Sequence, residues 1–142
     1  MSRVIVLDCC TTIAWLGHQH ITEKQRVYAQ QVLGSLNTHS QLLVPTLWTY
    51  ELSNTLLSLL KTRYITESDC QLFLESLQKL PIQVVPEPVV ESVSARIRMA
   101  QHHKLSAYDA AYLNIATAHR APLATLDNKL IAAARANGVY FQ

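Results

Sequence analysis

Residues 104–118, KLSAYDAAYLNIATA, are the stretch around which the rest of the chain is organised. Apolar residues recur along it at helical spacing, which predicts a helix, and Ser106 can cap the start of that helix. Asp109 interrupts the apolar pattern, and no Lys or Arg lies between Lys104 and Arg120. A carboxylate is costly to bury unless it is paired or bound to a metal, so Asp109 is expected either to pair with a distant group or to belong to a site.

Short apolar segments alternate with helical segments along the rest of the chain. Strands are expected at 4–7, 41–44, 82–85, 123–126 and 139–141, a short helix or turn at 11–16, a loop at 17–20, and helices at 22–36, 47–62, 66–80, 89–103, 104–118 and 130–136. This alternation predicts an α/β fold with a parallel sheet. With 142 residues, the chain is expected to form a single domain, residues 1–142.

The composition is that of a globular protein with a substantial core, since 49% of the residues are hydrophobic and 15% are charged. A net charge of +2 neither demands nor excludes a nucleic-acid partner. No apolar run approaches the roughly 20 residues that span a bilayer, and the first ten residues lack a signal-peptide core. Cys9, Cys10 and Cys70 do not form a disulfide framework. We therefore expect a soluble, cytoplasmic protein with reduced thiols.

Three acids fall where the predicted strands end. Asp8 follows strand 4–7, Asp127 follows strand 123–126, and Glu51 lies in the first turns of helix 47–62. The carboxyl ends of parallel strands share one edge of a sheet, and Asp109 would join the others there if its helix crosses that edge. Clustered carboxylates repel one another and favour a bound cation, and oxygen ligands suit Mg²⁺ or Mn²⁺. One or two such ions could activate water for phosphodiester hydrolysis.

Each acid taken alone also has a purely structural explanation. Asp8 or Asp127 could be a helix cap or a turn residue, Glu51 a solvated first-turn acid, and Asp109 one half of a buried ion pair. Asp69 is fully explained as an acid at the start of helix 66–80. The joint placement of the other four is what indicates a site.

Four segments resemble, in order, the motif regions of PIN-domain ribonucleases, and more narrowly those of the VapC toxins of bacterial type II toxin–antitoxin systems. They are VIVLDCC (4–10), LLVPTLWTYELSNTLL (42–57), KLSAYDAAYLNIATA (104–118) and APLATLDNKLIAAA (121–134). The resemblance covers nearly the whole chain. It implies a three-layer α/β/α sandwich with a parallel sheet, and a Mg²⁺- or Mn²⁺-dependent endoribonuclease site.

The resemblance also implies roles for particular residues. The family's metal-binding, catalytic acids carry over to Asp8, Glu51, Asp109 and Asp127. Thr125 matches a family Thr or Ser whose hydroxyl could hydrogen-bond a carboxylate or a water. Asn54 matches another family position, one helical turn from Glu51, and could support it.

One pair of residues departs from the family pattern. After the first acid the family typically has a small residue and then Ser or Thr, whereas this chain has Cys9-Cys10. A thiol is a poorer hydrogen-bond partner than a hydroxyl, which puts the surroundings of Asp8 in doubt. Whether Thr11 takes over that role is left open.

Partners follow from the resemblance as well: an RNA substrate, a second copy in a homodimer, and a cognate antitoxin that brings a basic side chain into the acidic site. The leucine-rich helices 47–60 and 66–80 could form a dimer face or an antitoxin groove, or could simply pack in the core. A basic run could hold RNA phosphates or be a solvated helix face. It comprises Arg96, Arg98, His102, His103 and Lys104.

Three other functions compete with that of a ribonuclease. A phosphatase of the haloacid-dehalogenase type needs a second Asp two positions after the first, where this chain has Cys10. A cysteine nucleophile needs a base, and the sequence does not identify one. The histidines do not have the spacing of metal ligands, which argues against a zinc site. A non-catalytic PIN-like module that binds RNA or a partner is the main alternative, and the presence of all four acids favours the enzyme.

Overall fold

A parallel sheet forms the centre of the computed structural model, which describes residues 2–17 and 20–142. Its strands are β1 (Val4–Leu7), β2 (Gln41–Val44), β3 (Ile82–Val84) and β4 (Leu123–Ala124). They pair in the order β3-β2-β1-β4, with Ile5 opposite Leu42 and Val6 opposite Leu123. The predicted α/β fold with a parallel sheet is confirmed.

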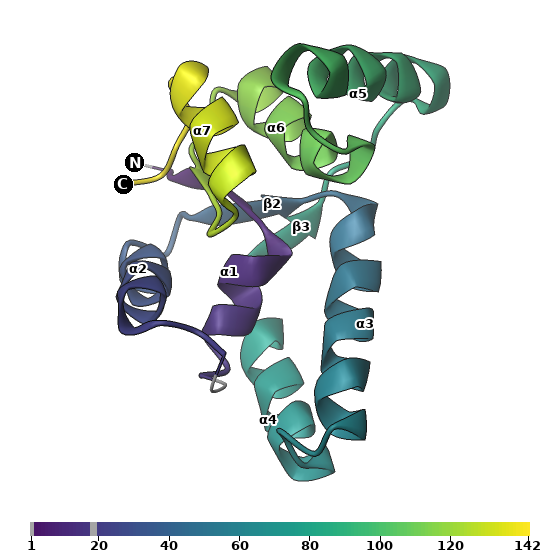
Figure 1. The fold of residues 1–142 in the computed structure, drawn as a ribbon. Helices are drawn as coiled ribbons and strands as arrows, with labels where there is room; N and C mark the ends of the chain where they lie inside the picture. The colour runs from purple at the N-terminus through teal and green to yellow at the C-terminus, as the bar shows by residue number, and fades with distance from the viewer. Residues whose placement is uncertain (1, 18–19) are drawn as a thin grey trace.

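Helices cover both faces of this sheet (Figure 1). In the described residues they are α1 (Cys9–Ala14), α2 (Glu23–Gly34), α3 (Thr46–Lys61), α4 (Glu67–Gln78), α5 (Val89–His103), α6 (Ala107–His119) and α7 (Asn128–Ala136). On one face α6 contacts β1, β2 and β4, with α5 and α7 packed beside it. The remaining helices lie on the other side of the sheet, which gives the three-layer α/β/α sandwich. None of the helices described is long and apolar enough to cross a membrane.

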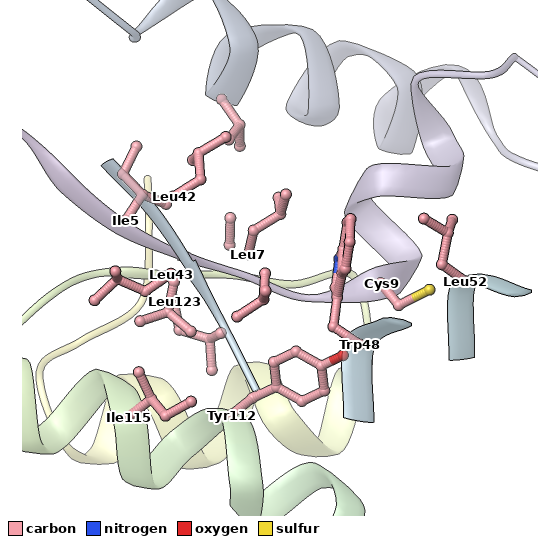
Figure 2. Packing of buried hydrophobic residues seen from close by; sticks show 14 of the residues in the cluster. Ile5, Leu7, Cys9, Leu42, Leu43, Trp48, Leu52, Tyr112, Ile115 and Leu123 are labelled. Carbon is pink, nitrogen blue, oxygen red and sulfur yellow. The ribbon is translucent and has the colours of Figure 1, made fainter. Parts of the chain in front are cut away.

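The core lies on both sides of the two central strands, β1 and β2. Ile5, Val6 and Leu7 are completely buried, as is Leu42 on the neighbouring strand. Figure 2 shows Leu43 and Leu123 on the side of the sheet that faces Ile115 and Tyr112 of α6. The continuous apolar runs read from the sequence are therefore strands buried on both faces.

The helix that contains Asp109 begins later than predicted. Lys104 adopts a left-handed conformation (φ 55°) that ends α5, and the Ser106 hydroxyl then accepts a 3.1 Å hydrogen bond from the Asp109 backbone N–H. The capping role of Ser106 is confirmed, but the helix starts at Ala107 rather than Lys104. Asp109 consequently lies in the first turn of α6, not in the middle of an apolar helix.

The carboxyl-terminal part of the sheet is also shorter than predicted. β4 ends at Ala124 because the chain turns away so that Asp127 can cap α7, which starts at Asn128. The predicted strand 139–141 is wrong: within the described residues that segment makes only an isolated bridge between Tyr140 and Leu123. The predicted loop 17–20 includes His18 and Gln19, which lie outside the described residues.

Leu42→Ala should lower the free energy of unfolding by about 2–5 kcal/mol, because Leu42 is 0% exposed and its loss leaves a cavity against the sheet. Urea denaturation followed by circular dichroism measures this. Ile97→Ala, at a position that is 51% exposed on α5, is the control and should stay within about 0.5 kcal/mol of the wild type. Equal losses in the two variants would contradict the assigned core.

Candidate metal-binding acidic site

Four different elements bring the four acids predicted from the sequence to one place. Asp8 is the residue between β1 and α1, Glu51 lies in α3, Asp109 in the first turn of α6, and Asp127 at the N-cap of α7. All four line the same cavity, whose volume is about 470 Å³. The carboxyl-end geometry of a parallel sheet, together with the start of α6, therefore produces the expected cluster.

This cavity is strongly acidic. Besides the four acids, its lining in the described residues consists of Cys9, Cys10, Ile13, His20, Ile21, Gln25, Thr55 and Leu126. That lining includes no Lys or Arg. Burial and the neighbouring Asp127 carboxylate raise the pKa of Asp109. The nearby Lys129 ammonium lowers it, but by less, so the pKa stays above its ordinary value. Such a cavity favours the binding of cations.

Asp8 is the most deeply buried of the four acids, with 7% of its surface exposed. Burial raises its pKa from an ordinary 3.8 to about 6, and the nearby Glu51 carboxylate adds to the rise. Its Oδ2 accepts hydrogen bonds from the Thr125 hydroxyl (2.7 Å) and the Cys10 thiol (3.1 Å), which work in the opposite direction. One carboxylate oxygen is thus held by the protein at the edge of the cavity.

Cys10 occupies the position where Ser or Thr was expected, and its thiol makes the contacts of a hydroxyl. It donates to Asp8 and accepts a hydrogen bond from the Leu126 backbone N–H at 3.3 Å. Thr11 does not substitute for it, because its hydroxyl donates to the Ala124 carbonyl instead. The departure from the family pattern therefore leaves the support of Asp8 in place.

Neither adjacent cysteine suits the role of nucleophile. Burial raises the pKa of Cys9 to about 12, and burial and the Asp8 carboxylate raise that of Cys10 further. A thiol that stays protonated at neutral pH reacts poorly. The structure therefore gives no support to the cysteine-nucleophile alternative.

Tyr112 is a residue of this site that the sequence pattern assigns only to the apolar face of its helix. Its side chain is 1% exposed, and its hydroxyl donates a hydrogen bond to Glu51 Oε1. Burial and the neighbouring Asp109 raise the pKa of Glu51, and the bond from Tyr112 partly offsets this. The sequence does carry a signal, because a buried tyrosine hydroxyl needs a partner and Tyr112 lies one turn after Asp109.

Two other sequence candidates are not brought to the cavity. Asn54 is exposed on α3, and the next residue, Thr55, lines the cavity instead. The basic run 96–104 contributes no side chain to its lining, and Arg96 pairs with Glu87 at 3.1 Å. The run therefore lies apart from the acids.

The donor set fits a hard divalent cation, although the side chains do not form a ready-made cage. Among the residues described, no three His, Cys, Asp or Glu side chains form a group that could hold a metal ion. Mg²⁺ commonly keeps several waters and uses only one or two carboxylates, so it does not require such a group. Mutual repulsion, which contributes to the raised pKa values of Asp8, Glu51 and Asp109, would be relieved by the ion.

Asp8→Asn should stabilise the metal-free protein at neutral pH. Because the pKa is about 6 in the folded protein and near 3.8 when exposed, ionisation of Asp8 costs nothing below about pH 4 and opposes folding increasingly up to about pH 6. The difference between these two pKa values corresponds to a free energy of unfolding that is about 3 kcal/mol higher in the variant than in the wild type at pH 7. Urea denaturation in EDTA at both ends of this range measures it.

Glu75→Gln, which removes an exposed acid of α4, is the control for that experiment and should change stability little at either pH. An Asp8→Asn effect that does not grow with pH would contradict the buried, ionisable carboxylate described here.

Comparison with solved structures shows the same fold in two other proteins. PAE2754 from Pyrobaculum aerophilum matches with a TM-score of 0.62 and 20% identity, covering 94% of this chain and 87% of that one. FitAcB from Neisseria gonorrhoeae matches with a TM-score of 0.59 and 20% identity, covering 92% of this chain and 93% of that one. The search of curated proteins finds no match. The family model of the PIN domain matches residues 5–136, which include all four acids, and the chain therefore belongs to the PIN domain family.

Proposed function

We propose that this protein is a metal-dependent endoribonuclease that hydrolyses RNA phosphodiester bonds as the cytoplasmic toxin of a type II toxin–antitoxin pair, with residues 1–142 acting as one domain. The observation that carries the proposal is the meeting of Asp8, Glu51, Asp109 and Asp127 on one cavity. Membership of the PIN domain family supports it, since PIN domains are generally nucleases. The VapC-like motifs and the fold shared with FitAcB support the toxin assignment.

In this proposal the four acids would hold one or two Mg²⁺ or Mn²⁺ ions, some of them through metal-bound waters. The ion supplies charge that neutralises the phosphodiester and lowers the pKa of water. Thr125 and Cys10 fix one oxygen of Asp8, which leaves the other oxygen for binding. Burial raises the pKa values of Glu51 and Asp109, which makes either carboxylate a better proton acceptor than an exposed one.

Asp109→Asn and Asp8→Asn should each lower RNA cleavage by at least about 100-fold, because a missing ligand costs more than the 10–100-fold typical of residues that only support ligands. The assay incubates purified, antitoxin-free protein with total cellular RNA in Mn²⁺, Mg²⁺ or EDTA. Discrete fragments that require metal are expected from the wild type and from Glu75→Gln, the matched acid control.

Two results would count against the enzyme. Full activity of Asp109→Asn would remove that acid from the site. Intact RNA after incubation with folded wild type, combined with RNA binding that persists in EDTA, would instead identify the non-catalytic PIN-like binding module.

Tyr112→Phe should reduce Mn²⁺ affinity or activity by about 10–100-fold while the protein stays folded, because it removes the hydrogen bond to Glu51 and keeps the ring. Titration of activity with Mn²⁺ measures the shift. Tyr50→Phe, which removes an exposed hydroxyl one residue before Glu51, is the control. Identical Mn²⁺ curves for the two variants would show that Tyr112 does not position Glu51.

The proposed protein partners are a second copy of the chain and a cognate antitoxin. A cavity lined by acids and without Lys or Arg in the described lining suits a basic antitoxin side chain. The leucine-rich helices divide between core and surface: Leu52, Leu56 and Leu59 are buried. Leu57 of α3 and Leu72 and Leu74 of α4 are exposed, which supports a role for the surface of these two helices in partner binding.

A further inference from the structure

A second cavity adjoins the acidic one and has the opposite chemical character. Its volume is about 370 Å³, and Gln25 and Leu126 line both cavities. Its other lining residues come from the start of α2, from α7 and from the end of the chain, which Figure 1 shows on the same side of the molecule. They are Thr22, Lys24, Tyr28, Asn128, Ile131, Arg135 and Tyr140. No acid contributes to this described lining.

Two cations in the second cavity are available to a ligand. Lys24 and Arg135 are exposed, and neither belongs to an ion pair among the described residues, where the pairs are Arg26–Glu23 and Arg96–Glu87. Unpaired cations beside an acidic cavity provide what that cavity lacks, which is direct attraction for phosphate.

The Arg135 side chain is held in position by aromatic rings. Its guanidinium lies 4.9 Å from the centre of the Tyr140 ring, and that ring stacks on Tyr28 with centres 5.8 Å apart and planes within 5°. The Tyr28 hydroxyl in turn donates to the Phe141 carbonyl at 3.0 Å. A guanidinium fixed in this way loses less entropy on binding, and its planar fork can contact a phosphate or stack on a base.

We propose that this second cavity binds a nucleotide of single-stranded RNA that flanks the scissile phosphodiester, with its phosphate on Lys24 and Arg135. The inference rests on the proposed ribonuclease function and gives it a substrate-binding subsite. Three features favour RNA over an acidic peptide: the shared wall with the acidic cavity, a planar cation for base stacking, and nearby Asn128 and Gln25 amides for base edges. The cations would guide one phosphate, while the acids act on the next.

The test compares two double variants that remove the same charge. Lys24→Gln/Arg135→Gln empties the second cavity of cations, whereas Lys79→Gln/Arg63→Gln removes an exposed pair that lines neither cavity. Both are made in the Asp8→Asn background so that the RNA stays intact. Fluorescence anisotropy of a labelled, short single-stranded RNA of mixed sequence gives the Kd over a series of KCl concentrations.

The first double variant should bind about 10-fold or more weakly at low salt, and the slope of log K against log[salt] should become shallower by about 0.7 for each phosphate that the protein no longer neutralises. The control double should keep the slope of the parent. Arg135→Lys should keep the slope, because the charge remains, yet bind more weakly than the parent because the planar fork is gone.

Equal weakening by both doubles, or an unchanged slope in Lys24→Gln/Arg135→Gln, would overturn the subsite. A second result would also overturn it: oligoglutamate of the same charge binds more tightly than the RNA, and its binding also depends on Lys24 and Arg135. The cavity would then be a site for an acidic peptide. The cleavage assay tests the nuclease separately from the subsite. Wild-type protein that leaves RNA intact in Mn²⁺ would contradict the proposed function. A salt slope that depends on Lys24 and Arg135 would still support RNA binding in the second cavity.

Discussion

The buried carboxylate of Asp8 is the constraint on which the rest of this site depends. It lies at the end of β1, one of the two central strands of the sheet, where desolvation opposes its charge. The hydroxyl of Thr125 and the thiol of Cys10 hold it there, and Cys10 also binds the backbone at Leu126. These contacts join the end of β1 to the segment that leads into α7, so supporting Asp8 also places the Asp127 loop.

The same helix that completes the core also completes the site. Along α6, Ile115 and Leu113 pack among buried side chains, while Asp109 at its amino end reaches the cavity. Tyr112 serves both purposes, with its ring in the core and its hydroxyl on Glu51. Packing of α6 on the sheet thereby fixes the separation between the acids of α3 and α6, and this rigidity is what a preorganised site requires.

Charge is divided between two neighbouring cavities rather than mixed within one. The acidic cavity accumulates carboxylates whose repulsion a divalent cation would relieve. The adjoining cavity holds Lys24 and an arginine fixed on Tyr140. In the proposed function, a polyanionic chain binds at one cavity and is cut at the other, since the described lining of the acidic cavity contains no Lys or Arg.

The sequence by itself determined the alternation of strands and helices, the Ser106 cap and the positions of Asp8 and Asp127 after strands, because hydrophobic period, capping chemistry and strand-end position are local properties. Only the packing of α3 and α6 brought Glu51 and Asp109 to the same cavity. The sequence-based prediction started α6 too early, made β4 too long and included a strand at 139–141 that those described residues do not form. Only the tertiary structure decided that Tyr112 reaches Glu51, that Cys10 rather than Thr11 supports Asp8, and that Arg135 lies over Tyr140. The Tyr112–Glu51 bond joins residues 61 positions apart. Cys10 also bonds to Leu126 near the other end of the chain, and the Tyr140 ring that contacts Arg135 stacks on Tyr28 of α2. These arrangements are therefore fixed by packing between distant segments and not by any local pattern.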